Sequence, residues 1–289
     1  MKTNHSAECG RRKAEGGRQH PASRPTPHAF CAPHSALRAR RAFTLLELLM
    51  VIAIIGIVAA LAMPTLRGIK PNAKVAATRQ LLEAVGRARQ LAISQRATVY
   101  MVFVPANFFS GLAGTNWGRV QTLADKQLTG YAYVALRSVG DQPGVRTARY
   151  LSPWRTLPKG AYIPPAKFGP GSGFTISNTP LGNLQIRPFA WTNNIPFPSE
   201  DNPVTVAVPL PYIAFDGMGQ LVSGPPGQPE LIPLTEGSVS FARDPDTKKA
   251  LAQLPQANEL PAGNTVDNYS LIYIDRLTGR ARVERRTVQ

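Results

Sequence analysis

The chain has 289 residues and a formal net charge of +16. Its length allows one or two domains with a sizeable core, and its positive charge favours anionic partners such as nucleic acid or lipid head groups. Both cysteines and all four histidines precede residue 42, which removes disulfides, thiolate nucleophiles, imidazole bases and the usual transition-metal ligands from the remainder. We therefore expect neither a cofactor nor a metal site after that point.

The first segment, residues 1–42, combines nine Lys or Arg with two Glu and holds almost no large apolar side chains. Such a composition cannot bury enough apolar surface to fold. We predict a basic, unstructured leader that stays in the cytosol. A misplaced start codon is the alternative explanation, and neither explanation places function in this segment.

An apolar run extends from Phe43 to Met63 and is interrupted by one carboxylate, Glu47. At about 1.5 Å per residue, a helix of that length spans about 30 Å, the thickness of the hydrocarbon layer of a membrane. Three arginines stand directly before it: Arg38, Arg40 and Arg41. The positive-inside tendency then keeps the N-terminal side in the cytoplasm and exports the rest. We predict a single transmembrane helix over residues 43–63.

Glu47 distinguishes three interpretations of this run. A secretory signal peptide would make Ala60-Leu61-Ala62 a cleavage site, but the run is too long for a signal peptide and contains an acid. A plain membrane anchor has no reason to hold an ionised side chain, which costs several kcal/mol or more in lipid. The third interpretation gives the acid a partner, because an acid inside a membrane segment is by default a functional group.

The motif around Glu47 resembles the N-terminus of type IV prepilins and type II secretion pseudopilins. Basic residues, a small residue and then Phe43-Thr44-Leu45-Leu46-Glu47-Leu48-Leu49 follow one another. The acid is fifth after the family's cleavage point, and Pro64 stands at the family's usual helix kink. The resemblance implies that prepilin peptidase cuts between Ala42 and Phe43 on the cytoplasmic face and methylates the new amine. The chain departs from the family at Ala42, where glycine is usual.

The resemblance also implies how subunits assemble. In a filament of staggered subunits, Glu47 of one subunit meets the Phe43 amine of its neighbour. An opposite charge a few ångströms away makes a buried carboxylate tolerable, whereas an unpaired one is penalised. We hypothesise that this pairing sets the axial register of the filament.

After the apolar run the pattern becomes that of an amphipathic helix. Pro64, Gly68 and Pro71 weaken the helix at the membrane exit. Apolar residues then recur at three- or four-residue steps: Val75, Leu82, Val85, Ala88 and Ala92. We predict that residues 64–96 continue the helix and pack on a soluble domain.

Residues 97–289 predict a β-rich domain. The run from Ala97 to Pro105 is β-branched and aromatic, as in a strand. With the preceding helix end it reads AVGRARQLAISQRATVYMVF, which resembles the GspH/FimT type of minor pseudopilin. We interpret residues 105–203 as an insertion between strands of the sheet. Within it we expect strands at Tyr131–Val139 and Thr147–Trp154, and mostly loop over 163–200.

Three late segments predict further strands. They are Val204–Val208 with Tyr212–Phe215, the run Gly237–Arg243, and the alternating hairpin from Asn268 to Glu284. Asp216-Gly217-Met218-Gly219 predicts a hairpin turn rather than a metal or phosphate loop. No internal repeat is visible.

The chain offers no nucleophile–base arrangement, phosphate loop or HExxH motif, so we expect no enzyme activity. Arginines concentrate near the C-terminus: Arg276, Arg280, Arg282, Arg285 and Arg286. Gly279-Arg280-Ala281-Arg282 resembles a stretch that FimT-type pilins use for DNA binding in natural transformation. Alternation would place Arg280 and Arg282 on one face of the last strand, facing phosphates. The alternative explanation is an edge strand that carries charge against aggregation.

Together these patterns predict an α+β protein in which a long N-terminal helix packs on an antiparallel sheet. The implied function is a structural subunit, a minor pseudopilin or pilin-like protein, of a type II secretion pseudopilus or a type IV pilus. Its implied partners are prepilin peptidase, other pilin subunits and the bacterial inner membrane, with the globular domain in the periplasm. A DNA-binding minor pilin that uses the C-terminal arginines is the alternative.

Overall fold

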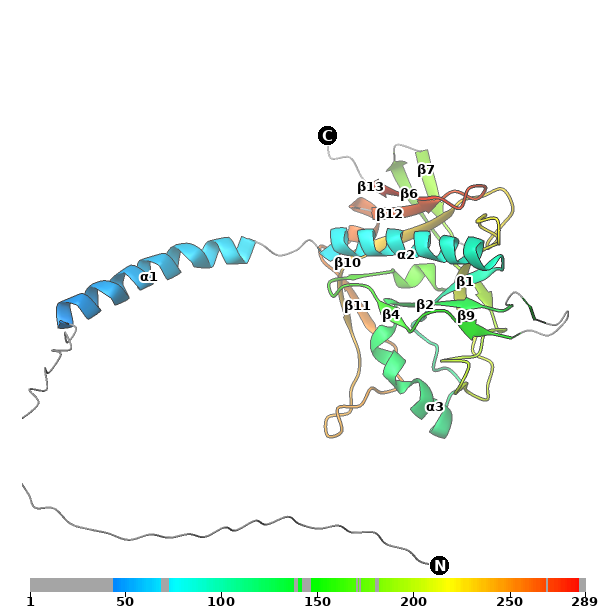
Figure 1. The fold of residues 1–289 in the computed structure, drawn as a ribbon, viewed down its shortest axis with the longest axis horizontal. Helices are drawn as coiled ribbons and strands as arrows, with labels where there is room; N and C mark the ends of the chain where they lie inside the picture. Colours follow the sequence, from blue (N-terminus) through cyan, green and yellow to red (C-terminus); the bar gives the residue numbers. More distant parts are fainter. Residues whose placement is uncertain are drawn as a thin grey trace, which may run out of the picture. The chain divides into compact units, whose positions relative to one another are not determined.

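The computed structural model describes residues 44–68, 73–137, 140–141, 147–169, 171, 173–179, 182–268 and 270–285. Within these ranges the side chains of residues 59–68 and 178 are not described. The chain divides after Leu61 into two compact units. Each unit is described by itself below (Figure 1).

Helix α1, Leu45–Gly68, carries apolar side chains on all sides. Every large apolar side chain between Leu45 and Val58 is exposed. The described residues contain no helix that is both long enough and apolar enough to cross a membrane. The predicted transmembrane helix of residues 43–63 is therefore not shown by the structure, which describes the side chains of α1 only as far as Val58.

Helix α2, Ala73–Gln95, is amphipathic in the way that its sequence predicts. Its buried stripe runs along small residues and one fully buried leucine, Leu81. Two residues of the expected stripe, Val75 and Leu82, are only half-buried. At the second of them the buried leucine is the preceding residue, Leu81. The many alanines let the helix backbone approach the sheets closely. The helix ends at Gln95, and the next residue, Arg96, has a left-handed φ of 48° that stops the helix.

The first sheet has the order β3-β2-β1-β9-β8, and β4 also pairs with β2. The strands are β1 (Val99–Phe103), β2 (Gly130–Ala135), β3 (Arg149–Tyr150), β4 (Arg155–Thr156), β8 (Ala190–Thr192) and β9 (Leu210–Phe215). Strand β1 pairs with β2 and β9 along its length, and every pairing in this sheet is antiparallel.

The second sheet has the order β11-β10-β12-β13, and β5 also pairs with β10. Its strands are β5 (Ala161–Tyr162), β10 (Glu230–Ser240), β11 (Gln256–Glu259), β12 (Ser270–Ile274) and β13 (Ala281–Arg285). A separate hairpin joins β6 (Phe174–Thr179) to β7 (Gly182–Ile186). Short helical segments lie between the strands: α3 (Gly114–Val120), η1 (Gln121–Lys126), η2 (Pro165–Lys167) and α4 (Asn264–Asp267).

Helix α2 lies across both sheets, with β12 and β13 on one side of it and β1, β2 and β9 on the other (Figure 1). The period-2 alternation of the strands decides which side chains meet it. Met101 of β1 and Ile272 of β12 join the α2 stripe in the main core. Val102 of β1 faces the opposite side and packs with α3 and η1. Leu271 of β12 faces the β6-β7 hairpin in a third, smaller cluster.

The structure confirms an α+β fold built on antiparallel sheets. It also confirms strands at the sites of β1, β2, β9, β12 and β13, and the turn at Asp216–Gly219. The strand expected at Val204–Val208 is wrong. Asn116 accepts a hydrogen bond from the backbone of Thr205 at 3.2 Å and donates to its hydroxyl at 2.8 Å, so this segment bonds to a side chain and not to a strand.

The range 105–203 is not set apart from the sheets. Strands β2, β3, β4 and β8 all belong to the first sheet, and β5 belongs to the second. The stretch 163–200, expected to be mostly loop, contains the β6-β7 hairpin and β8. Ile176 and Ile186 of that hairpin are fully buried against the second sheet. The many Pro, Gly and Asn residues of 163–200 predict turns, and they hide the short apolar alternation of β6 and β7.

Candidate functional site

The N-terminal motif is described only from Thr44 onward. Ala42 and Phe43, the predicted processing site, lie outside the described residues. The backbone N–H of Glu47 donates to the Thr44 hydroxyl at 3.2 Å, and the N–H of Leu48 donates to the Thr44 carbonyl at 3.1 Å. Thr44 thus caps the helix, and Thr44-Leu45-Leu46-Glu47 has the spacing of a capping box. The cap uses the backbone N–H of Glu47 and not its carboxylate.

The surroundings of Glu47 are apolar and open. Its own side chain is exposed, and Leu45 and Leu46 beside it are 81% and 78% exposed. The backbone of α1 continues as helix through Pro64, the predicted kink position. The first turn of α1 therefore presents a carboxylate within an apolar surface, at the helix end where the partial positive charge of the backbone stabilises it.

The C-terminal arginines do not form one cluster. Arg280 lies in the turn before β13 rather than on the strand, and its carbonyl accepts from the Asp275 N–H at 2.9 Å. Arg282 lies on β13, where its Nε donates to Glu284 Oε1 at 2.8 Å and its guanidinium lies 4.3 Å from the centre of the Tyr273 ring. Arg285 is exposed at the end of β13, and Arg286 lies outside the described residues.

Arg280 instead faces helix α2. The turn Gly279-Arg280-Ala281 and one side of α2 line a shallow hollow of about 1010 Å³. The helix contributes Arg87, Arg89 and Gln90 to it, with Glu83 as the single acid among these lining residues. The Nε of Arg89 donates to Gly219 O at 3.2 Å and to Thr278 O at 2.8 Å. Arg89 therefore ties a turn of each sheet to α2, which leaves Arg87 and Arg280 as the exposed cations of the hollow.

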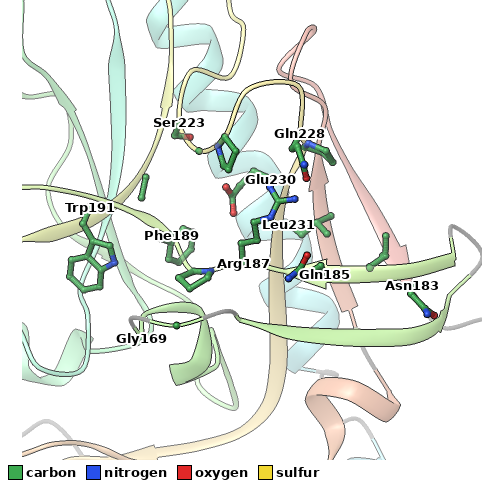
Figure 2. A pocket seen from close by; sticks show the side chains of 17 residues that line it. Gly169, Asn183, Gln185, Arg187, Phe189, Trp191, Ser223, Gln228, Glu230 and Leu231 are labelled. Carbon is green, nitrogen blue, oxygen red and sulfur yellow. The ribbon is translucent and has the colours of Figure 1, made fainter.

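A second cavity lies where the two sheets and the β6-β7 hairpin come together (Figure 2). It has a volume of about 800 Å³. Its walls come from β7 and the residues after it, from β8, from the loop Ser223–Pro229 and from the start of β10. Trp191 lies toward one end of this cleft and Asn183 toward the other (Figure 2).

A buried ion pair forms the floor of the cleft. Lys167 is fully buried and its ammonium donates to Glu230 Oε1, while Glu230 retains 10% of its side-chain exposure. The same ammonium donates to Arg187 O at 2.6 Å and lies 4.5 Å from the centre of the Phe189 ring. Burial lowers the pKa of Lys167, and the charge of Glu230 opposes that shift. Lys167 is at the end of η2, so the pair joins segments far apart in sequence.

Among the residues that the structure describes, no three His, Cys, Asp or Glu side chains gather as a metal site requires. Sequence reasoning could not have found the cleft, because its lining comes from several separate segments between residues 169 and 231. Its one local signal is Glu230 at the start of an apolar strand, Glu230-Leu231-Ile232. A charge at that position needs a partner when it is buried.

Comparison with known protein families gives a match at the N-terminus. Residues 37–63 match the family described as the prokaryotic N-terminal methylation motif. Neither the comparison with curated proteins nor the one with solved structures gives a significant match. The matched residues contain the predicted processing site and Glu47. The motif is that of a structural family rather than an enzymatic one, and it supports a type IV pilin-like protein that prepilin peptidase processes and that assembles with other pilin subunits.

Proposed function

We propose that the chain is a minor pseudopilin or minor pilin, a structural subunit of a type II secretion pseudopilus or a type IV pilus. The observation that carries the proposal is helix α1, whose apolar side chains are exposed around one acid in the first turn. Such a helix needs an apolar environment on every side. The helical core of a filament, or a membrane before assembly, would supply it.

The proposal assigns two steps to the N-terminus. Prepilin peptidase removes residues 1–42 and methylates the amine of Phe43. Residues 43–63 hold the subunit in the inner membrane with the globular domain in the periplasm, and Glu47 then pairs with the Phe43 amine of a neighbouring subunit. Apart from this pair, the apolar helices offer no directional contact that would fix the axial register.

Mass spectrometry of the membrane fraction tests the first step. The expected species begins with N-methylated Phe43. A chain that keeps residues 1–42, or one that has lost the apolar helix, would refute processing by prepilin peptidase. Ala42→Gly is expected to raise the processed fraction, because it restores the residue that is usual in the family.

Filament incorporation tests the second step. Glu47→Leu is expected to leave the chain in the membrane fraction but to remove it from sheared or cross-linked filaments. Glu83→Leu is the matched control, since Glu83 is an exposed acid on α2. Normal incorporation of the Glu47→Leu subunit would refute the pairing.

The GspH/FimT type is the subgroup that we propose, on the helix-to-strand passage from α2 into β1. The domain that follows has a single helix packed across antiparallel strands, which is compatible with that subgroup. Identification of the genes beside this one would distinguish a secretion system from a pilus.

A DNA-binding minor pilin is the second candidate function. Arg280 shares its hollow with Arg87 of α2, and this pair of exposed cations is the feature that favours it. Arg282, in contrast, is engaged with Glu284 and Tyr273. Duplex DNA should then bind with an affinity that falls steeply with added salt.

The DNA test uses two double variants. Arg87→Ala with Arg280→Ala should abolish retardation of duplex DNA, whereas Arg280→Ala with Arg282→Ala should weaken it less. Arg149→Ala with Arg155→Ala removes two exposed arginines from the first sheet and is the control. Absent or salt-insensitive binding by the unmodified protein would exclude this function.

A further inference from the structure

The cleft between the β6-β7 hairpin and the loop Ser223–Pro229 has the size and lining of a ligand site. Its volume of about 800 Å³ falls in the range of small-molecule sites, roughly 300–1,000 Å³. Its lining alternates apolar groups with a few convergent polar ones, which is the usual character of such sites. Figure 2 shows polar side chains along the cleft between Trp191 and Asn183, so an elongated ligand fits it better than a compact one.

The most specific group in the cleft is Glu230. Its Oε1 is occupied by Lys167. Among the described residues no hydrogen-bond donor reaches Oε2, although the side chain is nine-tenths buried. Oε2 faces the cleft beside Gly224, where an added Cβ would lie 3.5 Å from it. This second carboxylate oxygen is an acceptor available at the wall of the cleft, so a ligand that donates a hydrogen bond fits this point.

The charges around Glu230 restrict the ligand further. Lys167 and Arg187 are cations near the carboxylate, and the Arg187 side chain points into the cleft (Figure 2). The charge of Lys167 is balanced by Glu230, so Arg187 is the unbalanced charge of the three and disfavours a cationic ligand. A carboxylate or phosphate group placed at Glu230 would offer Oε2 no donor and would be repelled by its charge. A neutral ligand whose groups both donate and accept satisfies Glu230 and Arg187 at once, and a hydroxyl group does both.

The remaining lining supports the same chemistry. Asn183 and Gln228 are exposed amides that both donate and accept. Trp191 is 36% exposed and is the one exposed aromatic ring of the cleft among the described residues. A sugar ring has a hydroxyl-bearing edge, which matches the polar side chains, and an apolar face, which matches the indole of Trp191. Grooves for extended proline-rich peptides are instead lined by several aromatic rings.

From these contacts we propose that the cleft binds a neutral oligosaccharide. Glu230 Oε2 accepts from a sugar hydroxyl, and Arg187 and Gln228 donate to others. Trp191 covers the apolar face of a ring at one end. The site is independent of α1 and of the C-terminal arginines, so it stands whether or not the chain assembles into a filament.

The test uses the full-length protein in detergent micelles on an array of neutral, acidic and basic glycans, followed by calorimetric titration of each neutral glycan that binds. We expect saturable binding of at least one neutral oligosaccharide, with an affinity that added salt leaves unchanged. Trp191→Ala should weaken it about tenfold, and Glu230→Gln about 10- to 100-fold. Met218→Ala and Gln253→Ala are the controls, since both residues are exposed outside the cleft.

Three outcomes would overturn the proposal. One is the absence of binding to every neutral glycan. Another is binding only to acidic glycans that weakens with salt, which would make Arg187 a simple anion site. The third is binding of a neutral glycan that Trp191→Ala and Gln228→Ala leave unchanged, which would place the ligand elsewhere. Trp191→Ala keeps the ion pair of Lys167 intact, so it tests the cleft even where Glu230→Gln impairs folding.

Discussion

Helices α1 and α2 are of nearly equal length, 24 and 23 residues, yet their side chains meet opposite surroundings. The apolar side chains of α1 from Leu45 to Val58 are exposed. The apolar stripe of α2 is buried, and Leu81 and Val85 are fully so. None of the three core clusters contains a described residue of α1.

The difference separates two uses of apolar sequence. In α2 the apolar residues occupy one stripe, because the helix must join a core on one side and meet water on the other. In α1 they occupy every side, so no single packing surface could bury them. The hydrophobic content of α2 therefore stabilises this domain.

The strongest test of this comparison is a leucine truncation in each helix. Leu81→Ala should lower the free energy of unfolding of the globular domain by about 2–5 kcal/mol, because it opens a cavity between both sheets. Leu49→Ala, the matched change in α1, should leave it unchanged. Urea unfolding of the full-length protein in micelles, followed by tryptophan fluorescence, measures both. An equal loss in the two variants would mean that α1 belongs to the domain core.

The close approach of Gly279 to Gly219 gives the next largest expected loss of stability. Gly279 has a φ of 62°, and an added Cβ would lie 1.9 Å from Gly219 O. Gly279→Ala should cost about 2–4 kcal/mol through this overlap and the left-handed backbone. Gly111→Ala, where φ is 78° and no atom lies within 4 Å, should cost only about 1 kcal/mol. Thermal unfolding of both variants would show whether the contact or the backbone angle dominates.

A smaller effect is expected at Arg89, which joins the turns of the two sheets to α2. Arg89→Met should cost about 1–2 kcal/mol, because it removes two charge-assisted hydrogen bonds while keeping the length of the side chain. Arg87→Met, at an exposed position two residues earlier on the same helix, should cost less than about 0.5 kcal/mol. If the two variants unfold alike, Arg89 does not fasten the sheets to the helix.

The last expected effect is a dependence of stability on alkaline pH. Burial raises the pKa of Tyr162 to about 12 and raises the pKa values of Tyr133 and Tyr150 as well. In the unfolded chain tyrosines ionise near pH 10, so between about pH 10 and 12 the native state holds more protons. Stability should therefore fall as the pH rises through this window.

The buried lysines have the opposite effect on the pH dependence of stability at lower pH. Burial lowers the pKa values of Lys74 and Lys167, so the unfolded chain holds more protons and stability rises as the pH approaches 10.5. Ultraviolet titration of tyrosinate in the folded protein checks the tyrosine part. A single step near pH 10 for all tyrosines would contradict it.

The sequence predicted the elements whose pattern is local. The amphipathic α2, the strand β1 and the hairpin from β12 to β13 follow from periodicities of about 3.6 and 2. The same reasoning failed at Val204–Val208, where the backbone N–H of Thr205 donates to the Asn116 side chain and that of Val204 donates to Phe197 O. It also failed over 163–200, where the six- and five-residue strands β6 and β7 stand among Pro, Gly and Asn residues that predict loop, and where β8 has only three residues.

The candidate sites divide in the same way. The processing site at Ala42 and Phe43 and the acid Glu47 are contiguous in the chain, so the sequence alone determined that motif, and it remains the basis of the proposed function. Only the tertiary structure decided that Arg280 faces Arg87 across a hollow, and that Lys167 meets Glu230 at a cleft. Those contacts join segments tens to hundreds of residues apart, and their geometry depends on how the two sheets pack on α2, which no local pattern encodes.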